Sequence, residues 1–169
     1  MLRTIHKSII FSFVLFSSSC RFFSNSLDPV PRYEQWWKER HDSYVRVAQT
    51  HKVNVLFLGD SITDFWRQEG IDIWKEYFEP LNAVNFGIGS DRIQHVHWRI
   101  RNGEVNNISP KLVVLMIGTN NLEDNTADDI FSSETALIDD IHKLLPNSKI
   151  LILGIFPRVD VRSVEFRKK

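Results

Sequence analysis

A serine that could act as a nucleophile follows the first strongly apolar run of the sequence. The run 53–58 (VNVLFL) is followed by GDSITD, which places Ser61 between a predicted strand and a predicted helix. A serine in such a turn is exposed, and its own N–H points toward the start of the helix, so it can offer both a nucleophile and an oxyanion donor. The alternative is that Ser61 or Thr63 only caps the helix. No Gly-Lys-Ser/Thr follows, which disfavours a phosphate loop, and the Gly-x-Ser-x-Gly nucleophile elbow is absent.

Two further apolar runs end in groups that can donate hydrogen bonds to a developing oxyanion. Gly89 and Ser90 follow the run 83–86, and their backbone N–H groups precede a predicted helix. Asn120 follows the run 112–117, and its amide can donate an N–H without taking up the serine proton. Ordinary turn chemistry explains each end taken alone. The three ends in this order form a more specific signal than any one of them.

The elements that position these turns are predicted from alternating apolar runs and helix-like segments. Strands are predicted at 53–58, 83–86, 112–117 and 150–153, and helices at 33–49, 64–78, 91–102 and 126–145. Near-continuous apolar strands separated by helices indicate a parallel sheet covered on both faces, so we expect an α/β fold. Five of the seven glycines follow the four runs. They lie at the edge where open α/β sheets bind ligands.

Length and composition narrow the classes of function. The chain has 169 residues, which allows one domain, and its 21 basic and 21 acidic residues give a formal net charge of zero. This balance disfavours a nucleic-acid binder, which needs excess cationic charge. A single cysteine excludes an internal disulfide and a cysteine-based zinc site. His95 and His97 are two residues apart in a predicted helix and do not share a face, so we expect no metal site and no other cofactor.

Residues 1–27 have the pattern of a targeting segment. Three basic residues and no acidic residue occur in it, and a basic start (1–7), an apolar run (8–16) and small residues (17–20) follow in order. The apolar run is shorter than the roughly 20 residues that span a bilayer. We expect a secreted or extracytoplasmic protein, with Cys20 as a candidate lipoprotein site. Two alternatives are that the segment directs import into an organelle, or that it is an ordinary N-terminal helix of a cytoplasmic protein. The folded domain is then expected over 28–169.

Taken together, the three strand ends resemble the first three sequence blocks of the SGNH (GDSL-type) hydrolases. The likeness to the family rests on Gly59-Asp60-Ser61, on 85–91 and on Gly118-Thr119-Asn120. Within the family, the sequence also resembles the catalytic subunits of platelet-activating-factor acetylhydrolase, and the segments that carry this second likeness are 55–61, 85–89, 95–99, 118–121 and 153–158. The resemblance implies a three-layer α/β sandwich with a parallel, flavodoxin-like sheet. It also implies a serine esterase that cleaves short acyl (acetyl) esters of lipids or carbohydrates through an acyl-enzyme, and subunits that form homo- or heterodimers.

The resemblance assigns roles residue by residue. Ser61 matches the nucleophile and contributes one oxyanion N–H, and Asn120 matches the side-chain oxyanion donor. Asp60 matches the acid beside the nucleophile, which is expected to order the turn. The backbone donor of the second block falls on Ser90, where the family usually has glycine, and Gly89 is expected to take part of this role.

The last block of the family has no match in the sequence. The family completes its triad with Asp-x-x-His, whose histidine takes the serine proton, whereas the sequence after Arg158 reads VDVRSVEFRKK. We therefore expect a C-terminally truncated domain with four of the five family strands, inactive as it stands. The alternative is a noncatalytic remnant that binds an intact homologue or another partner. A flavodoxin-like nucleotide-binding domain is disfavoured because phosphate-binding lysines are missing.

Overall fold

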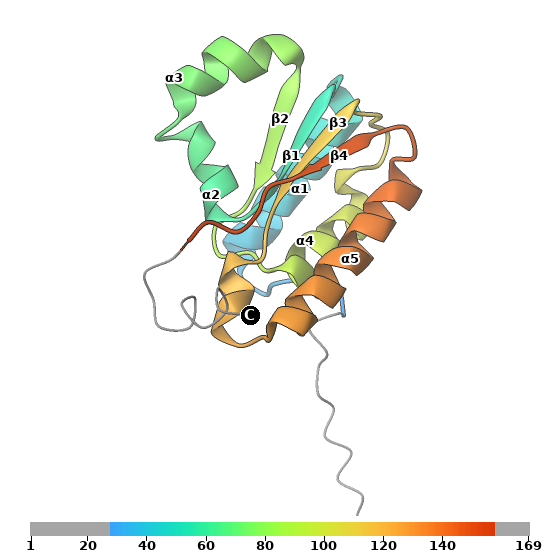
Figure 1. Ribbon diagram of the computed structural model, residues 1–169. Coiled ribbons are helices and arrows are strands. Elements are labelled where there is room, and N and C mark those ends of the chain that lie inside the picture. The colour runs from blue at the N-terminus through green and yellow to red at the C-terminus, as the bar shows by residue number, and fades with distance from the viewer. Residues whose placement is uncertain (1–27, 158–169) are drawn as a thin grey trace, which may run out of the picture.

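Four parallel strands form the centre of the structure, a computed structural model that describes residues 28–157 (Figure 1). The strands are β1 (Val55–Gly59), β2 (Ala83–Gly87), β3 (Leu112–Met116) and β4 (Lys149–Ile152). Their order across the sheet is β2-β1-β3-β4, and Gly59 pairs with both Gly87 and Met116. The carboxyl ends of three strands are therefore level with one another. The predicted α/β fold with a parallel sheet is confirmed, and each strand begins and ends within two residues of its predicted bounds.

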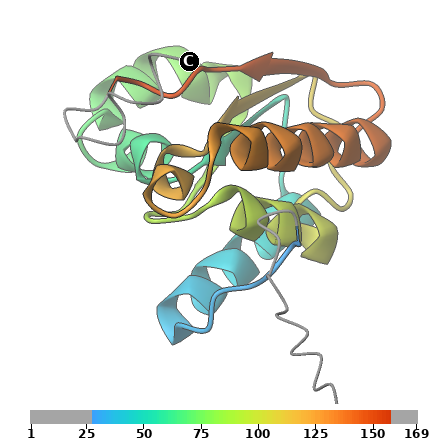
Figure 2. The ribbon, with the colours of Figure 1, turned by 60° about the horizontal axis from the view of Figure 1, so that its bottom comes forward.

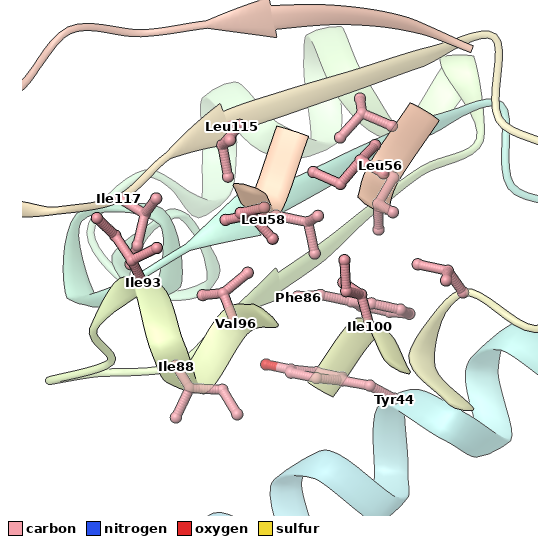
Figure 3. Packing of buried hydrophobic residues seen from close by; sticks show 14 of the residues in the cluster. Tyr44, Leu56, Leu58, Phe86, Ile88, Ile93, Val96, Ile100, Leu115 and Ile117 are labelled. Carbon is pink, nitrogen blue, oxygen red and sulfur yellow. The ribbon is translucent and has the colours of Figure 1, made fainter. Parts of the chain in front are cut away.

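Three helices cover one face of the sheet (Figures 1 and 2). They are α1 (Gln35–Thr50), α4 (Ile93–Arg99) and α5 (Ala127–Leu144). Side chains of β1 alternate between the two faces, and Leu56 and Leu58 point toward these helices with no exposed surface. They belong to one hydrophobic cluster with Val96 of α4, Ile141 of α5 and Tyr44 of α1 (Figure 3). This core holds the site-bearing strand ends against a rigid helical layer.

The second face of the sheet has a thinner helical layer. The chain between β1 and β2 crosses it as α2 (Ser61–Asp64), η1 (Phe65–Arg67), α3 (Ile71–Ile73), η2 (Trp74–Phe78) and η3 (Glu79–Leu81). A groove of about 320 Å³ lies between this crossing and β4, lined by apolar side chains that include Phe57, Trp66 and Val114. Leu151 and Ile152 of β4 are each 47% exposed. The predicted three-layer arrangement is therefore present, with one layer built from short pieces.

The prediction of one continuous helix over 64–78 is wrong. The backbone leaves the helical region at Gln68 (φ −125°, ψ −82°) and again at Gly70 (φ −100°, ψ 13°). Gly70 packs so closely on Trp66 that a Cβ atom would lie 2.8 Å from Cε3 of the indole ring. Glycine inside a helix also costs about 1 kcal/mol relative to alanine. Close packing and weak helix propensity therefore break this segment into separate turns.

Two shorter helical segments complete the described part of the chain. η4 (Ile100–Glu104) continues α4, and η5 (Thr119–Glu123) follows β3. No helix among the described residues is both long and apolar enough to cross a membrane. The predicted targeting segment 1–27 and the tail 158–169 lie outside the described residues. The domain boundary at residue 28, Cys20 as a lipoprotein site and the C-terminal truncation therefore stay predictions.

Candidate active site

Ser61 lies where β1 gives way to α2. Asp60 is the N-cap of α2, and its Oδ1 accepts the N–H of Ile62 at 2.9 Å. Burial raises the pKa of Asp60, although the hydrogen bond from Ile62 opposes this shift. The alternative in which Ser61 or Thr63 caps the helix is wrong, because Asp60 does so. Ser61 is half-buried, and within residues 28–157 no hydrogen bond engages its hydroxyl.

The second strand end lies directly beside the serine. A Cβ atom built on Gly89 would lie 4.0 Å from Cβ of Ser61. The N–H of Gly89 donates to Oδ2 of Asp64 at 3.1 Å. The Gly89 amide hydrogen therefore already has a partner in the structure, and its share in the oxyanion role stays a prediction. Ser90 follows with φ of 64° and is exposed, and its N–H stays the predicted donor of the second block.

The third strand end is tied to the second. Gly118 ends the extended chain with φ of 113°, a conformation that favours glycine. Asn120 then lies in η5, and its Nδ2 donates to the carbonyl oxygen of Asp91 at 2.8 Å. The adjacent Asn121 is fully buried, and its Oδ1 accepts the N–H of Ile93 at 3.0 Å. The structure therefore brings together all three turns that the sequence singled out.

Three side chains that the sequence analysis did not single out hold the second turn in place. Tyr44 Oη donates to the carbonyl oxygen of Gly87 at 2.7 Å, and Arg67 Nη2 donates to the same oxygen at 3.1 Å. Arg32 Nη1 donates to the carbonyl oxygen of Gly89 at 2.8 Å. The donors come from α1, η1 and the segment before α1, so their partners are 20 to 57 residues away in sequence. No local pattern could have revealed them.

A buried cluster of charged residues lies behind the second turn. Arg99 is fully buried and pairs with Asp91 (Nε–Oδ2 2.9 Å) and with Glu104 (Nη1–Oε2 2.7 Å). Trp37 Nε1 donates to the other oxygen of Asp91 at 2.8 Å, and His41 Nδ1 lies 2.8 Å from Glu104 Oε1. Burial raises the pKa of Asp91 to about 6, although Arg99 opposes the shift. The cluster anchors α1, α4 and η4 to the residue whose carbonyl orients Asn120.

The histidines do not supply a general base in the described part of the chain. His95 Nδ1 accepts the N–H of Arg92 at 3.0 Å, and His97 Nε2 lies 2.8 Å from Asp140. Burial, assisted by the charge of Arg32, lowers the pKa of His95 to about 4. No group of three metal-binding side chains occurs among the residues that the structure describes. Within 28–157 no histidine has a recorded contact with Ser61.

Comparison with known proteins identifies the family. The sequence profile of the GDSL-like lipase/acylhydrolase family matches residues 57–168. Human platelet-activating factor acetylhydrolase IB subunit alpha2 is 43% identical over 122 residues, which are 72% of this chain and 52% of the relative. The rat alpha1 subunit is 40% identical over 122 residues, which are 72% of this chain and 51% of the relative. The chain therefore spans about half the length of the curated relatives it matches.

Solved structures agree with this assignment at the level of fold. A GDSL-like lipase from Bacteroides thetaiotaomicron VPI-5482 is similar with a TM-score of 0.59 and 19% identity, over 76% of this chain and 69% of that one. The matched profile begins inside β1 and includes Ser61, Ser90 and Asn120. The resemblance inferred from the strand ends is thus confirmed, and the chain belongs to the GDSL-like lipase/acylhydrolase family.

Proposed function

We propose that residues 28–169 form the domain of a serine ester hydrolase that cleaves short acyl esters through an acyl-enzyme on Ser61. The observation that carries this proposal is the convergence of three strand ends, with Gly89 beside Ser61 and Asn120 bound to Asp91. Family membership supports ester hydrolysis as the class of reaction. Relatives named as acetylhydrolases support a small acyl group, acetyl above all, on a lipid or carbohydrate alcohol.

In the proposed reaction Ser61 Oγ attacks the ester carbonyl, and the alcohol leaves. The negative charge on the carbonyl oxygen is held by the N–H groups of Ser61 and Ser90 and by the side chain of Asn120. One Asn120 N–H already donates to Asp91, which fixes the amide and leaves the other N–H for the oxyanion. Loss of one such donor typically costs about 10²- to 10³-fold in turnover. Water then releases the acyl group, and no cofactor takes part in these steps.

We propose that the general base is the histidine of an Asp-x-x-His motif, which does not occur in these 169 residues, and that these residues alone acylate slowly or not at all. A serine hydroxyl without a base is a poor nucleophile near neutral pH. Loss of one triad member costs on the order of 10⁴- to 10⁶-fold in turnover. The described histidines are engaged elsewhere, as for His97 with Asp140.

Acetylation of Ser61 by excess p-nitrophenyl acetate tests the proposal. We expect slow release of at most one equivalent of p-nitrophenolate and one acetyl group on the peptide that contains Ser61, located by mass spectrometry. Ser61→Ala should remove this adduct, because it removes the hydroxyl that is proposed to attack the ester. Ser132→Ala, at an exposed serine of α5, serves as the control and should leave it unchanged. Equal phenolate release by Ser61→Ala and the unaltered chain would contradict the assignment.

A second candidate function is that of a noncatalytic chain that pairs with an intact homologue, a copy of itself or another partner. The open groove on the second sheet face and the exposed Leu151, Ile152 and Phe156 favour it. Large contiguous apolar patches on soluble proteins commonly mark interaction sites. A dimer in sedimentation velocity without acetylation of Ser61 would support this candidate. A monomer that acetylates at Ser61 would support the esterase.

We further propose that residues 1–27 direct the protein out of the cytoplasm, with import into an organelle or retention in the cytoplasm as the alternatives. The order of basic, apolar and small residues supports a secretory signal. Mass spectrometry of the protein from its native cells is expected to find a mature N-terminus at or after Cys20. Recovery of peptides from residues 1–16 in the mature protein would contradict cleavage.

A further inference from the structure

We propose that Asp64 is a positioning residue that fixes the turn Gly87–Ser90 relative to Ser61, a role that rests on the proposed esterase function. Asp64 is the last residue of α2, the four-residue helix that begins with Ser61. Its Oδ2 accepts the N–H of Gly89 at 3.1 Å. One turn of helix thus carries the proposed nucleophile at one end and the anchor of the proposed oxyanion turn at the other.

The other oxygen of Asp64 is held by two guanidinium groups. Oδ1 is ion-paired with Arg67, and Arg40 Nη1 lies 3.5 Å away. Arg67 also donates to the carbonyl oxygens of Gly87 and Asn85, both at 3.1 Å. The Asp64 side chain is only 16% exposed. Because both of its oxygens have partners, the carboxylate cannot rotate without breaking a contact to the turn or to the arginines.

The anchored amide immediately precedes the proposed donor. Gly89 has no side chain to restrict its backbone. Its N–H, in the peptide plane shared with Ile88, is held by Asp64, and its carbonyl oxygen, in the plane that carries the Ser90 N–H, is held by Arg32. Ser90 follows in the left-handed region with φ of 64°. A displacement of about 1 Å in a catalytic group can cost about 100-fold in rate. Loss of the Asp64 contact should free the Ile88–Gly89 peptide and thereby shift the Ser90 N–H that follows it, while leaving Ser61 chemically intact.

Two substitutions separate positioning from simple charge neutralisation of the arginines. Asp64→Ala removes both the acceptor for Gly89 and the negative charge. Asp64→Asn keeps an oxygen that can accept the Gly89 N–H, but it carries no charge. If Asp64 acts through Gly89, the asparagine variant should resemble the unaltered chain. If it only neutralises Arg67 and Arg40, the two variants should be equally impaired.

The first measurement is the reaction of Ser61 with a p-nitrophenyl alkylphosphonate. Ser61 Oγ forms a bond to phosphorus, p-nitrophenolate leaves, and the serine proton passes to solvent; the tetrahedral adduct then presents an oxygen to the proposed donors. We expect Asp64→Ala to lower the maximal rate about 10- to 100-fold, with the half-saturating probe concentration unchanged. Asp64→Asn should stay within about threefold of the unaltered chain. Asp72→Ala, at an exposed aspartate of α3, is the control and should react normally.

The second measurement is amide hydrogen exchange at Gly89, read by NMR without any ligand. Asp64→Ala should accelerate exchange of the Gly89 amide at least tenfold relative to amides of β3, while Asp64→Asn retains its protection. Unchanged Gly89 exchange in Asp64→Ala overturns the proposal. If the phosphonate modifies another residue of the unaltered chain instead of Ser61 but the exchange result holds, the esterase proposal fails and the anchoring role stands. If Asp64→Ala does not fold, the test rests on Asp64→Asn. Loss of protection of the Gly89 amide in Asp64→Asn would then overturn the proposal.

Discussion

Replacing Gly87 by alanine is expected to destabilise the fold by about 3 kcal/mol and to slow acylation of Ser61. Gly87 ends β2 and lies against the main chain of α2. A Cβ atom at this position would lie 2.5 Å from the backbone N of Asp64 and 2.8 Å from the carbonyl carbon of Thr63. Main-chain atoms of a helix cannot move aside singly. The methyl group must therefore displace the whole of α2, and Ser61 with it.

Urea unfolding monitored by tryptophan fluorescence measures this effect. Gly154→Ala is the matched control, because a Cβ atom at Gly154 would meet no atom of residues 28–157 within 4 Å. The control should change the free energy of unfolding by no more than about 0.5 kcal/mol. Acetylation of Ser61 by p-nitrophenyl acetate should fall in Gly87→Ala and remain normal in Gly154→Ala. Equal unfolding midpoints for the two variants would show that α2 does not pack on β2 as described.

The sequence predicted the sheet well because its signals are local. Each strand is a short apolar run that stops at or near a glycine, and Gly59 illustrates the reason. A side chain there would collide with the carbonyl oxygen of Met116 and with Thr63, so the end of the run is fixed by packing. The prediction of a helix over 64–78 was wrong because Gly70 and the aromatic packing on the sheet override the helix-like composition of this segment.

The candidate site was predictable only in part, for a related reason. Ser61, Ser90 and Asn120 lie at strand ends, and strand ends can be read from the sequence. The hydrogen bond from the Gly89 amide to Asp64 joins residues that are 25 apart in sequence, so the sequence could not show that this amide has a partner. Contacts between elements, rather than residue types, decide which backbone N–H groups remain available.

Replacing Arg99 by methionine is expected to destabilise the fold by about 3–5 kcal/mol. The side chains of Arg99, Asp91 and Glu104 are all fully buried. Methionine fills a similar volume but leaves two carboxylates in the interior without their cation. Lys38→Met is the control, because Lys38 is 63% exposed and pairs with Asp42, which is 43% exposed. Exposed ion pairs contribute about 0–1 kcal/mol, so the control should unfold almost as the unaltered chain does.

The cause of this loss can be isolated by neutralising the carboxylates. If the penalty comes from unpaired buried charge, adding Asp91→Asn and Glu104→Gln to Arg99→Met should restore part of the lost stability.

Lower pH should also restore part of the stability of Arg99→Met, because burial already raises the pKa of Asp91 to about 6 with Arg99 present. Removal of Arg99 takes away the stronger of the two charges that oppose this rise, the other being that of Arg32, so protonation would relieve the penalty at a still higher pH. The difference in unfolding free energy between Arg99→Met and the unaltered chain should therefore shrink between pH 8 and pH 5. A constant difference over this range would instead assign the loss to packing around the arginine stem and to its hydrogen bond with the Phe86 carbonyl oxygen.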